Sequence, residues 1–158
     1  MKTLIIYASR TGTTEKAVQM IAEKLKETPD IINIGAVKKT DLSGYDFILV
    51  GGPIKMGRLY KPVKQFLAKN RAALMTKRFG LFLACGYPQE LENYFKVILD
   101  DAMREHAEVL TDIGYAYYLE NMGPVEQRVV MQLANTQKSI EAYKPEAIQK
   151  IADVINGK

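Results

Sequence analysis

Tryptophan is absent from this chain of 158 residues, and cysteine and histidine each occur only once. The single cysteine, Cys85, cannot form a disulfide within the chain, which is typical of proteins from a reducing compartment such as the cytoplasm. The single histidine, His106, offers no cluster of the ligands from which metal centres are built. No apolar run reaches the roughly 18 residues that a transmembrane helix needs. We therefore expect a cytoplasmic protein without a disulfide, a metal centre or a transmembrane segment.

The chain is basic, with a net charge of +4 and a sequence pI of about 9.0. A basic balance suits nucleic acid, an anionic membrane surface or an anionic substrate as a partner. Lysine and arginine are nonetheless scattered along the chain rather than clustered among aromatic residues. We therefore expect no nucleic-acid partner. Two alternatives stay open: an ordinary solvated surface, or a basic face for peripheral contact with a membrane or an anionic substrate.

Five short, nearly continuous apolar runs alternate with segments of helical periodicity. The apolar runs predict strands that are buried on both faces, at residues 2–8, 31–37, 46–51, 79–85 and 109–119. The helical patterns begin near residues 13, 62, 88, 125 and 145. The first helix is expected to run for about four turns. It should end near Thr28 and Pro29, because a residue before proline avoids the helical region.

The alternation of strands and helices predicts an α/β fold. Right-handed crossovers between parallel strands place helices on both faces of the sheet. We expect a three-layer doubly wound sandwich around a five-stranded parallel sheet, formed by one domain over residues 1–158. No small-residue cleavage site follows the apolar start of the chain, so we assign that start to the first strand rather than to a signal peptide.

The loop between the first predicted strand and the first predicted helix has the chemistry of a phosphate site. Its six residues are Ser9, Arg10, Thr11, Gly12, Thr13 and Thr14. Hydroxyl groups, a glycine that permits an unusual turn and the free amides of a helix N-terminus together suit a dianionic phosphate. The Gly-Lys-Ser/Thr ending of the nucleotide-binding P-loop and the Gly-x-Gly-x-x-Gly dinucleotide fingerprint are both absent. The alternative is a helix start that the threonines merely cap.

These six residues match the Ser/Thr-x-Thr-Gly-x-Thr phosphate loop of flavodoxins, and they follow the expected strand Thr-Leu-Ile-Ile-Tyr-Ala. The spacing to Gly51 and to Cys85 and Gly86 is also similar to that family. The chain therefore resembles the flavodoxin family over essentially its whole length. Residues 51–60 and 120–134 resemble the Gly-x-x-Ile-Arg/Lys-x-Gly pattern and the extra helical insertion of one subgroup, which contains menaquinone-dependent protoporphyrinogen dehydrogenase.

This resemblance implies the strand order 2-1-3-4-5 and FMN as the cofactor. In that order the ends of strands one, three and four meet at one edge of the sheet, where ligands of open α/β sheets bind. The loop at residues 9–14 would bind the phosphate. The implied second binding segment comprises Pro53, Ile54, Lys55, Met56, Gly57 and Arg58. The implied third segment comprises Cys85, Gly86, Tyr87 and Gln89.

Several residues of these segments have two interpretations. Lys55 and Arg58 either raise the reduction potential of the flavin through a local positive field or are ordinary solvated cations. Tyr60 and Tyr87 either border the flavin ring or are surface tyrosines. Cys85 ends an apolar strand and has no basic neighbour in the sequence, so we interpret it as a buried, unreactive thiol.

No nucleophile is paired with a base in the sequence, so we expect chemistry centred on the flavin and no catalytic side chain. The resemblance implies an FMN-dependent oxidoreductase of the protoporphyrinogen- or quinone-linked type. It would take electrons from a reduced substrate or nicotinamide and pass them to a quinone or a partner protein. A non-enzymatic electron carrier that docks on acidic partners is a second hypothesis. A flavin-free signalling domain on the same scaffold is a third.

Overall fold

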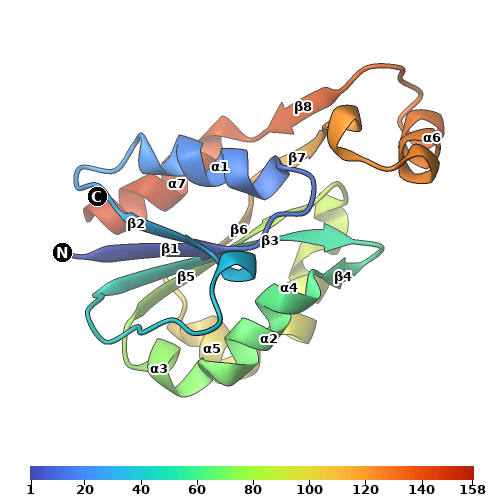
Figure 1. The fold of residues 1–158 in the computed structure, drawn as a ribbon. Coiled ribbons are helices and arrows are strands. Elements are labelled where there is room, and N and C mark those ends of the chain that lie inside the picture. The colour runs from blue at the N-terminus through green and yellow to red at the C-terminus, as the bar shows by residue number, and fades with distance from the viewer.

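A parallel β-sheet forms the centre of the computed structural model, which describes residues 1–158. The order of its five parallel strands is β2-β1-β3-β5-β6 (Figure 1). They are β1 (Thr3–Tyr7), β2 (Asp30–Asn33), β3 (Phe47–Lys55), β5 (Arg78–Ala84) and β6 (Val109–Asp112). A short strand, β4 (Arg58–Leu59), pairs antiparallel with the end of β3. Counted along the chain, the parallel strands have the order 2-1-3-4-5, so the predicted fold class is confirmed.

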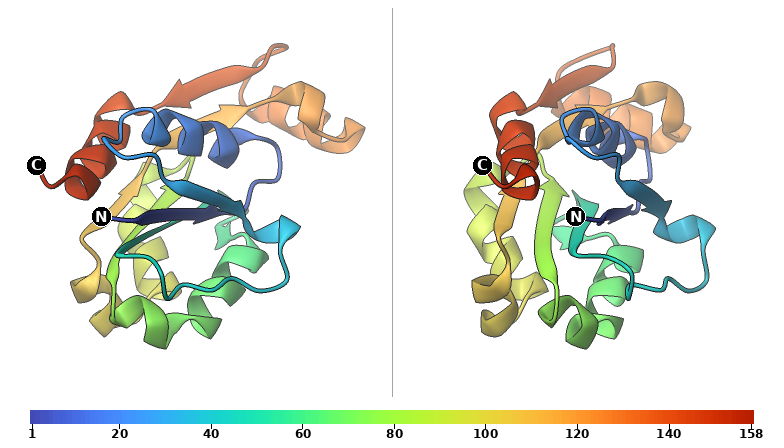
Figure 2. Two further views of the ribbon diagram at one scale, coloured as in Figure 1. Left: turned by 60° about the vertical axis from the view of Figure 1, so that its left-hand side comes forward. Right: turned by 90° about the vertical axis from the view of Figure 1, so that its left-hand side faces the viewer.

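Helices cover both faces of this sheet, as Figures 1 and 2 show. One face carries α1 (Thr13–Ala22) and α7 (Pro145–Asn156). The other carries α2 (Lys61–Lys69), α3 (Arg71–Met75), α4 (Leu91–Ile98) and α5 (Asp101–His106). None of the helices combines the length and the apolar character that crossing a bilayer requires.

Two hydrophobic cores lie between these layers, one on each face of the sheet. Successive strand residues point to opposite faces, so Ile5 belongs to the core under α1 and α7 while Ile6 belongs to the other. Leu49 and Val50 divide between the two cores in the same way. All four side chains have no exposed surface. The uninterrupted apolar runs of the sequence therefore reflect a sheet that is covered on both sides.

The chain leaves the central sheet after β6. There, β7 (Gly114–Tyr117) and β8 (Ile140–Tyr143) form a separate antiparallel pair, and α6 (Pro124–Leu133) lies in the connection between them. We call residues 114–143 the insertion. Figure 1 shows it extending beyond the carboxyl edge of the sheet, with α6 at its far end. The predicted helix at residues 125–133 is confirmed as α6, whereas β8 was not predicted.

The prediction of one continuous fifth strand at residues 109–119 is wrong in its second half. β6 ends at Asp112, and Gly114 adopts a φ of +90°. A side chain at Gly114 would overlap the carbonyl oxygen of Ala142 in β8. The glycine thus permits both the left-handed backbone and the close approach of the partner strand. These two features direct β7 to β8 instead of the central sheet.

Two predicted boundaries near the N-terminus are also wrong. α1 ends at Ala22 rather than near Pro29. Its last turn is closed by a tighter bond, in which the Lys24 amide donates to the Ile21 carbonyl at 2.9 Å. β2 ends at Asn33, because the Asn33 side-chain oxygen accepts the Gly35 amide at 3.0 Å and starts a 3-10 turn. The predicted strand at residues 31–37 is therefore only half strand.

The predicted helix after Pro88 is divided in two. The helix after Pro88 is interrupted at Leu99, which is extended, and Asp100 then caps α5 by accepting the Met103 amide at 2.9 Å. The helix predicted to begin near residue 62 is confirmed as α2, and α3, which was not predicted, follows after Asn70.

We predict that Gly51→Ala lowers the free energy of unfolding by about 1–3 kcal/mol, the cost typical of overpacking a core. A methyl group at Gly51 would overlap the buried ring of Phe82 on the neighbouring strand. Gly44→Ala is the matched control, because nothing lies within 4 Å of a side chain added there. Urea unfolding of both variants measures the difference. Equal stabilities would contradict this account of the β3–β5 contact.

Candidate cofactor site

The three predicted binding segments meet at the carboxyl edge of the sheet. They follow β1, β3 and β5, which are hydrogen-bonded neighbours in that order. The register confirms their proximity: the Ala8 amide donates to the Gly51 carbonyl at 3.2 Å, and Pro53 pairs with Ala84. The fold therefore brings together segments that are far apart in the sequence.

Ser9 and Gly12 shape the first segment, which we call the phosphate loop (residues 9–14). The Ser9 hydroxyl oxygen accepts the Gly12 amide at 3.1 Å and the Glu15 amide at 3.4 Å. Gly12, with a φ of +99°, precedes the first turn of α1. This local closure aims the N-terminus of α1 at the carboxyl edge of the sheet, which is the usual geometry of an anion site.

The three threonines of the phosphate loop differ in their bonding. The Thr13 hydroxyl donates to the Ala116 carbonyl at 3.0 Å, whereas Thr11 is half-buried and makes no side-chain bond. Thr14 is fully buried, and its hydroxyl oxygen has no hydrogen-bond partner. The backbone amides of Thr13 and Thr14 have no partner within the chain either. A buried hydroxyl and two free amides at one helix end are the groups that an anion would satisfy.

The second segment is a hairpin arm, because β3 continues beyond residue 51, where the sequence predicted the strand to end. β3 runs through Pro53, Ile54 and Lys55, and Lys55 pairs with Arg58 across the turn. Met56 and Gly57 form the turn with φ values of 51° and 76°, the left-handed pair that two-residue hairpins favour. The Met56 side chain is 91% exposed. An exposed apolar side chain thus stands at the tip of the arm.

Cys85 begins the third segment and is buried. Its amide donates to the Gly114 carbonyl at 2.9 Å, and its sulfur accepts the Tyr87 amide at 3.4 Å. Burial raises the pKa of the Cys85 thiol above its usual range. Gly86, Tyr87 and Gln89 are exposed beside it, and these exposed residues can approach a ligand.

The two tyrosines proposed for the flavin ring differ in position. Tyr87 is 61% exposed at the carboxyl edge. Tyr60 packs against the core on the α2 side of the sheet. The geometry therefore favours Tyr87 over Tyr60 as a side chain that is free to contact a ring.

Arg10 and Lys55 both contact the carboxylate of Glu126, a contact that the sequence did not predict. Arg10 forms a two-pronged ion pair with Glu126 of α6, in which its Nη1 lies 3.0 Å from Oε2. Lys55 Nζ lies 3.8 Å from Glu126 Oε1. The hydrogen bonds from Arg10 hold the pKa of the Glu126 carboxyl below its usual range, and the charges of Arg10 and Lys55 add to this effect. Arg58 forms no ion pair, and Lys55 has only this shared carboxylate, so the arm keeps a net positive charge.

The insertion also contacts the phosphate loop directly. Asn121 Nδ2 donates to the Thr11 carbonyl at 2.8 Å, and the Tyr143 hydroxyl donates to the Thr13 carbonyl at 3.1 Å. The Tyr143 oxygen lies 2.9 Å from that of Tyr118. Burial, followed by this contact, raises the pKa of Tyr143. Sequence patterns did not indicate these residues, because their contacts with the phosphate loop join positions more than one hundred apart.

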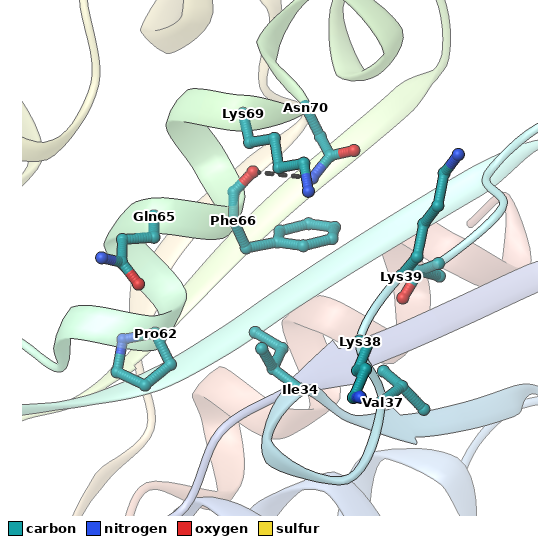
Figure 3. A pocket seen from close by; sticks show the side chains of 10 residues that line it. Ile34, Val37, Lys38, Lys39, Pro62, Gln65, Phe66, Lys69 and Asn70 are labelled. Atoms are coloured by element: carbon teal, nitrogen blue, oxygen red, sulfur yellow. Dashed lines mark hydrogen bonds between the residues drawn. The ribbon is translucent and has the colours of Figure 1, made fainter.

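A hollow of about 220 Å³ lies away from these segments, between the chain after β2 and helix α2 (Figure 3). Lys38 and Lys39 line one side of it and Lys69 the other, with Phe66 between them (Figure 3). None of the residues predicted to bind FMN lines this hollow. It is therefore separate from the candidate site.

His106 and the carboxylates form no metal centre. His106 Nε2 contacts the carbonyl oxygens of Leu74 and Lys77, at 3.1 and 2.6 Å, at the end of α5. No three His, Cys, Asp or Glu side chains are grouped to hold a metal ion. His106 instead ties α5 to the end of α3.

We predict that the native Cys85 thiol reacts with iodoacetamide at neutral pH at least about tenfold more slowly than it does in the urea-unfolded chain. The side chain is 2% exposed and its pKa is raised, so both access and the thiolate fraction are low. Mass spectrometry of timed samples gives both rates. Equal rates would mean that Cys85 is open to solvent.

Two curated proteins resemble parts of this chain. Protoporphyrinogen IX dehydrogenase [quinone] of Escherichia coli K12 is 29% identical over 77 residues, which are 47% of this chain and 42% of the enzyme. Flavodoxin 1 of Salmonella typhimurium is 42% identical over 50 residues, which are 31% of this chain and 28% of that protein. The chain thus aligns with less than half the length of these curated relatives.

Two further comparisons each span most of the chain, one with a solved structure and one with a family model. Flavodoxin 2 from Bacillus cereus superposes with a TM-score of 0.61 at 18% identity, over 99% of this chain and 97% of that one. Its likeness shows the fold. The sequence model described as Flavodoxin domain matches residues 4–142, which include all three segments of the candidate site. The chain therefore belongs to the flavodoxin family.

Proposed function

We propose that this chain is an FMN-dependent oxidoreductase whose phosphate loop holds the phosphate of the cofactor. Membership of the flavodoxin family makes FMN the cofactor. The observation that carries the assignment to residues 9–14 is the buried Thr14 hydroxyl, which has no hydrogen-bond partner within the chain. Such a group costs stability unless a ligand satisfies it.

The residues present fit a phosphate of this kind. The amides of Thr13 and Thr14 and the Thr14 hydroxyl offer three donors to one anion. The dipole of α1 adds attraction for negative charge at the same point. No lysine belongs to the loop, and the Arg10 guanidinium is already paired with Glu126. Binding through neutral donors suits a terminal monophosphate, which needs no metal bridge.

The second and third segments would surround the flavin ring. When bound, FMN supplies one- and two-electron transfer, and the protein contributes position and electrostatics. Pro53 and Ile54 on β3, with Gly86 and Tyr87 after β5, present backbone and ring surface at the same edge as the phosphate loop. Arg58 contributes a positive charge that no carboxylate of the chain neutralises.

The quinone-linked assignment rests on three observations. The curated relative with 29% identity bears the name protoporphyrinogen IX dehydrogenase [quinone]. The insertion lies beside the candidate site and carries exposed apolar side chains, including Val125 and Leu133. The net charge of +4 suits an anionic substrate. We propose that electrons enter from a reduced substrate or nicotinamide and leave to a quinone, in one cytoplasmic domain over residues 1–158.

A non-enzymatic electron carrier is the second candidate, and the match to Flavodoxin 1 favours it. An anaerobic assay separates the two. FMN-loaded protein is mixed with protoporphyrinogen IX or NADH as donor and menadione as acceptor, and free FMN at equal concentration is the control. Turnover well above free FMN with either donor supports the enzyme. Turnover no faster than that of free FMN with both donors, together with a very low midpoint potential of the bound flavin, would favour the carrier.

We predict that Thr14→Val weakens FMN binding roughly ten- to a hundredfold, because a hydrogen bond to a charged group contributes about 1.5–3 kcal/mol. Riboflavin, which lacks the phosphate, should bind Thr14→Val and the wild type equally. Without flavin, the variant should be at least as stable as the wild type, since valine removes an unpaired buried hydroxyl. Fluorescence titration and urea unfolding give these quantities.

Thr28→Val is the matched control for this experiment, because Thr28 is exposed and outside the loop. Unchanged FMN affinity in Thr14→Val would mean that the Thr14 hydroxyl does not bind the phosphate. Equal affinity of the wild type for FMN and riboflavin would contradict the proposal that residues 9–14 bind the phosphate.

A further inference from the structure

Helix α6 is weakly anchored to the rest of the molecule. It contains no buried residue, and the side chains of Val125, Val129 and Leu133 are 77%, 48% and 78% exposed. The Gln127 side chain donates to two carbonyls within the insertion itself. Every hydrogen bond or ion pair that joins a side chain of α6 to the central domain goes through Glu126.

Glu126 joins α6 to two different segments of the cofactor site. Arg10 belongs to the phosphate loop after β1, and Lys55 ends β3 in the hairpin arm. The Glu126 side chain is 25% exposed and that of Arg10 is 31% exposed, so their pairing is partly shielded from water. A two-pronged, charge-assisted pair in this setting is stronger than a fully exposed one.

From these contacts we propose that Glu126 latches α6 across the two cofactor segments and thereby controls the rate at which FMN enters and leaves. The phosphate loop and the hairpin arm follow the neighbouring strands β1 and β3, and Glu126 joins one to the other. A ligand that enters between these two segments would meet α6 while the ion pair holds. The inference rests on the proposed placement of the FMN phosphate in residues 9–14.

A latch and a simple charge effect predict opposite changes in the release rate of FMN when Glu126 loses its charge. If Glu126 acted only as a negative charge near an anion site, its removal would speed the association of FMN and slow its release. If Glu126 acts as a latch, its removal speeds both steps. The release rate of FMN therefore distinguishes the two effects.

Glu126→Gln tests this proposal, since glutamine keeps the size of the side chain and removes its charge. We expect the association and release rate constants of FMN both to rise about tenfold, while the dissociation constant changes by less than about threefold. Stopped-flow flavin fluorescence gives association, and the fluorescence recovered on dilution gives release. Glu146→Gln, an equal change of charge at an exposed position on α7, should behave as the wild type. An unchanged or slower release in Glu126→Gln would overturn the latch.

Hydrogen exchange of the flavin-free protein tests the contact independently of FMN. Amides of α6 should exchange severalfold faster in Glu126→Gln than in the wild type or in Glu146→Gln. Equal exchange in all three would overturn the latch, whatever the flavin kinetics. If no variant binds FMN, the proposed function fails, and the exchange result alone then decides whether Glu126 holds α6.

Discussion

The parallel pairing of β1, β3 and β5 is the constraint on which the rest of this structure depends. Parallel neighbours end at the same edge of a sheet, so the segments that follow these three strands must meet there. Burial of both faces fixes the register, since Ile5 and Ile6 already point into opposite cores. Gly51 lets the Phe82 ring pack against the backbone of β3 at this edge. The candidate site is thus a consequence of sheet topology before any polar contact is considered.

The phosphate loop depends in turn on the insertion. Ala116, Asn121 and Tyr143 each bond to the loop, so a segment about one hundred residues away helps to hold its shape. The same segment satisfies the Thr13 hydroxyl and leaves the Thr14 hydroxyl unpaired. Two adjacent threonines therefore have different roles. One ties the loop to β7, and the other has a buried hydroxyl without a partner, which we propose binds the phosphate.

Part of the positive charge of the candidate site is offset within the chain by one carboxylate on α6. Arg10 and Lys55 lie in separate predicted binding segments, yet Glu126 pairs with both. Glu126 therefore weakens the positive field that the sequence suggested around Lys55 and Arg58, although one carboxylate does not neutralise both Arg10 and Lys55. A single carboxylate on α6 thus contributes to the electrostatics of the candidate site and joins the insertion to it. This coupling agrees with a helix that buries none of its own side chains.

The sequence by itself determined the fold class and the strand order implied by the family resemblance, and it indicated residues 9–14 as the candidate phosphate loop. Those features follow from local patterns: apolar runs for doubly buried strands, and hydroxyls with glycine before a helix. Only the tertiary structure decided that Gly114 diverts β7 from the sheet, that Pro53 to Lys55 are strand rather than loop, and that Glu126 faces Arg10. The reason is physical. These features depend on contacts between distant residues, and hydrophobic periodicity reports which face of an element is buried but not which partner covers it.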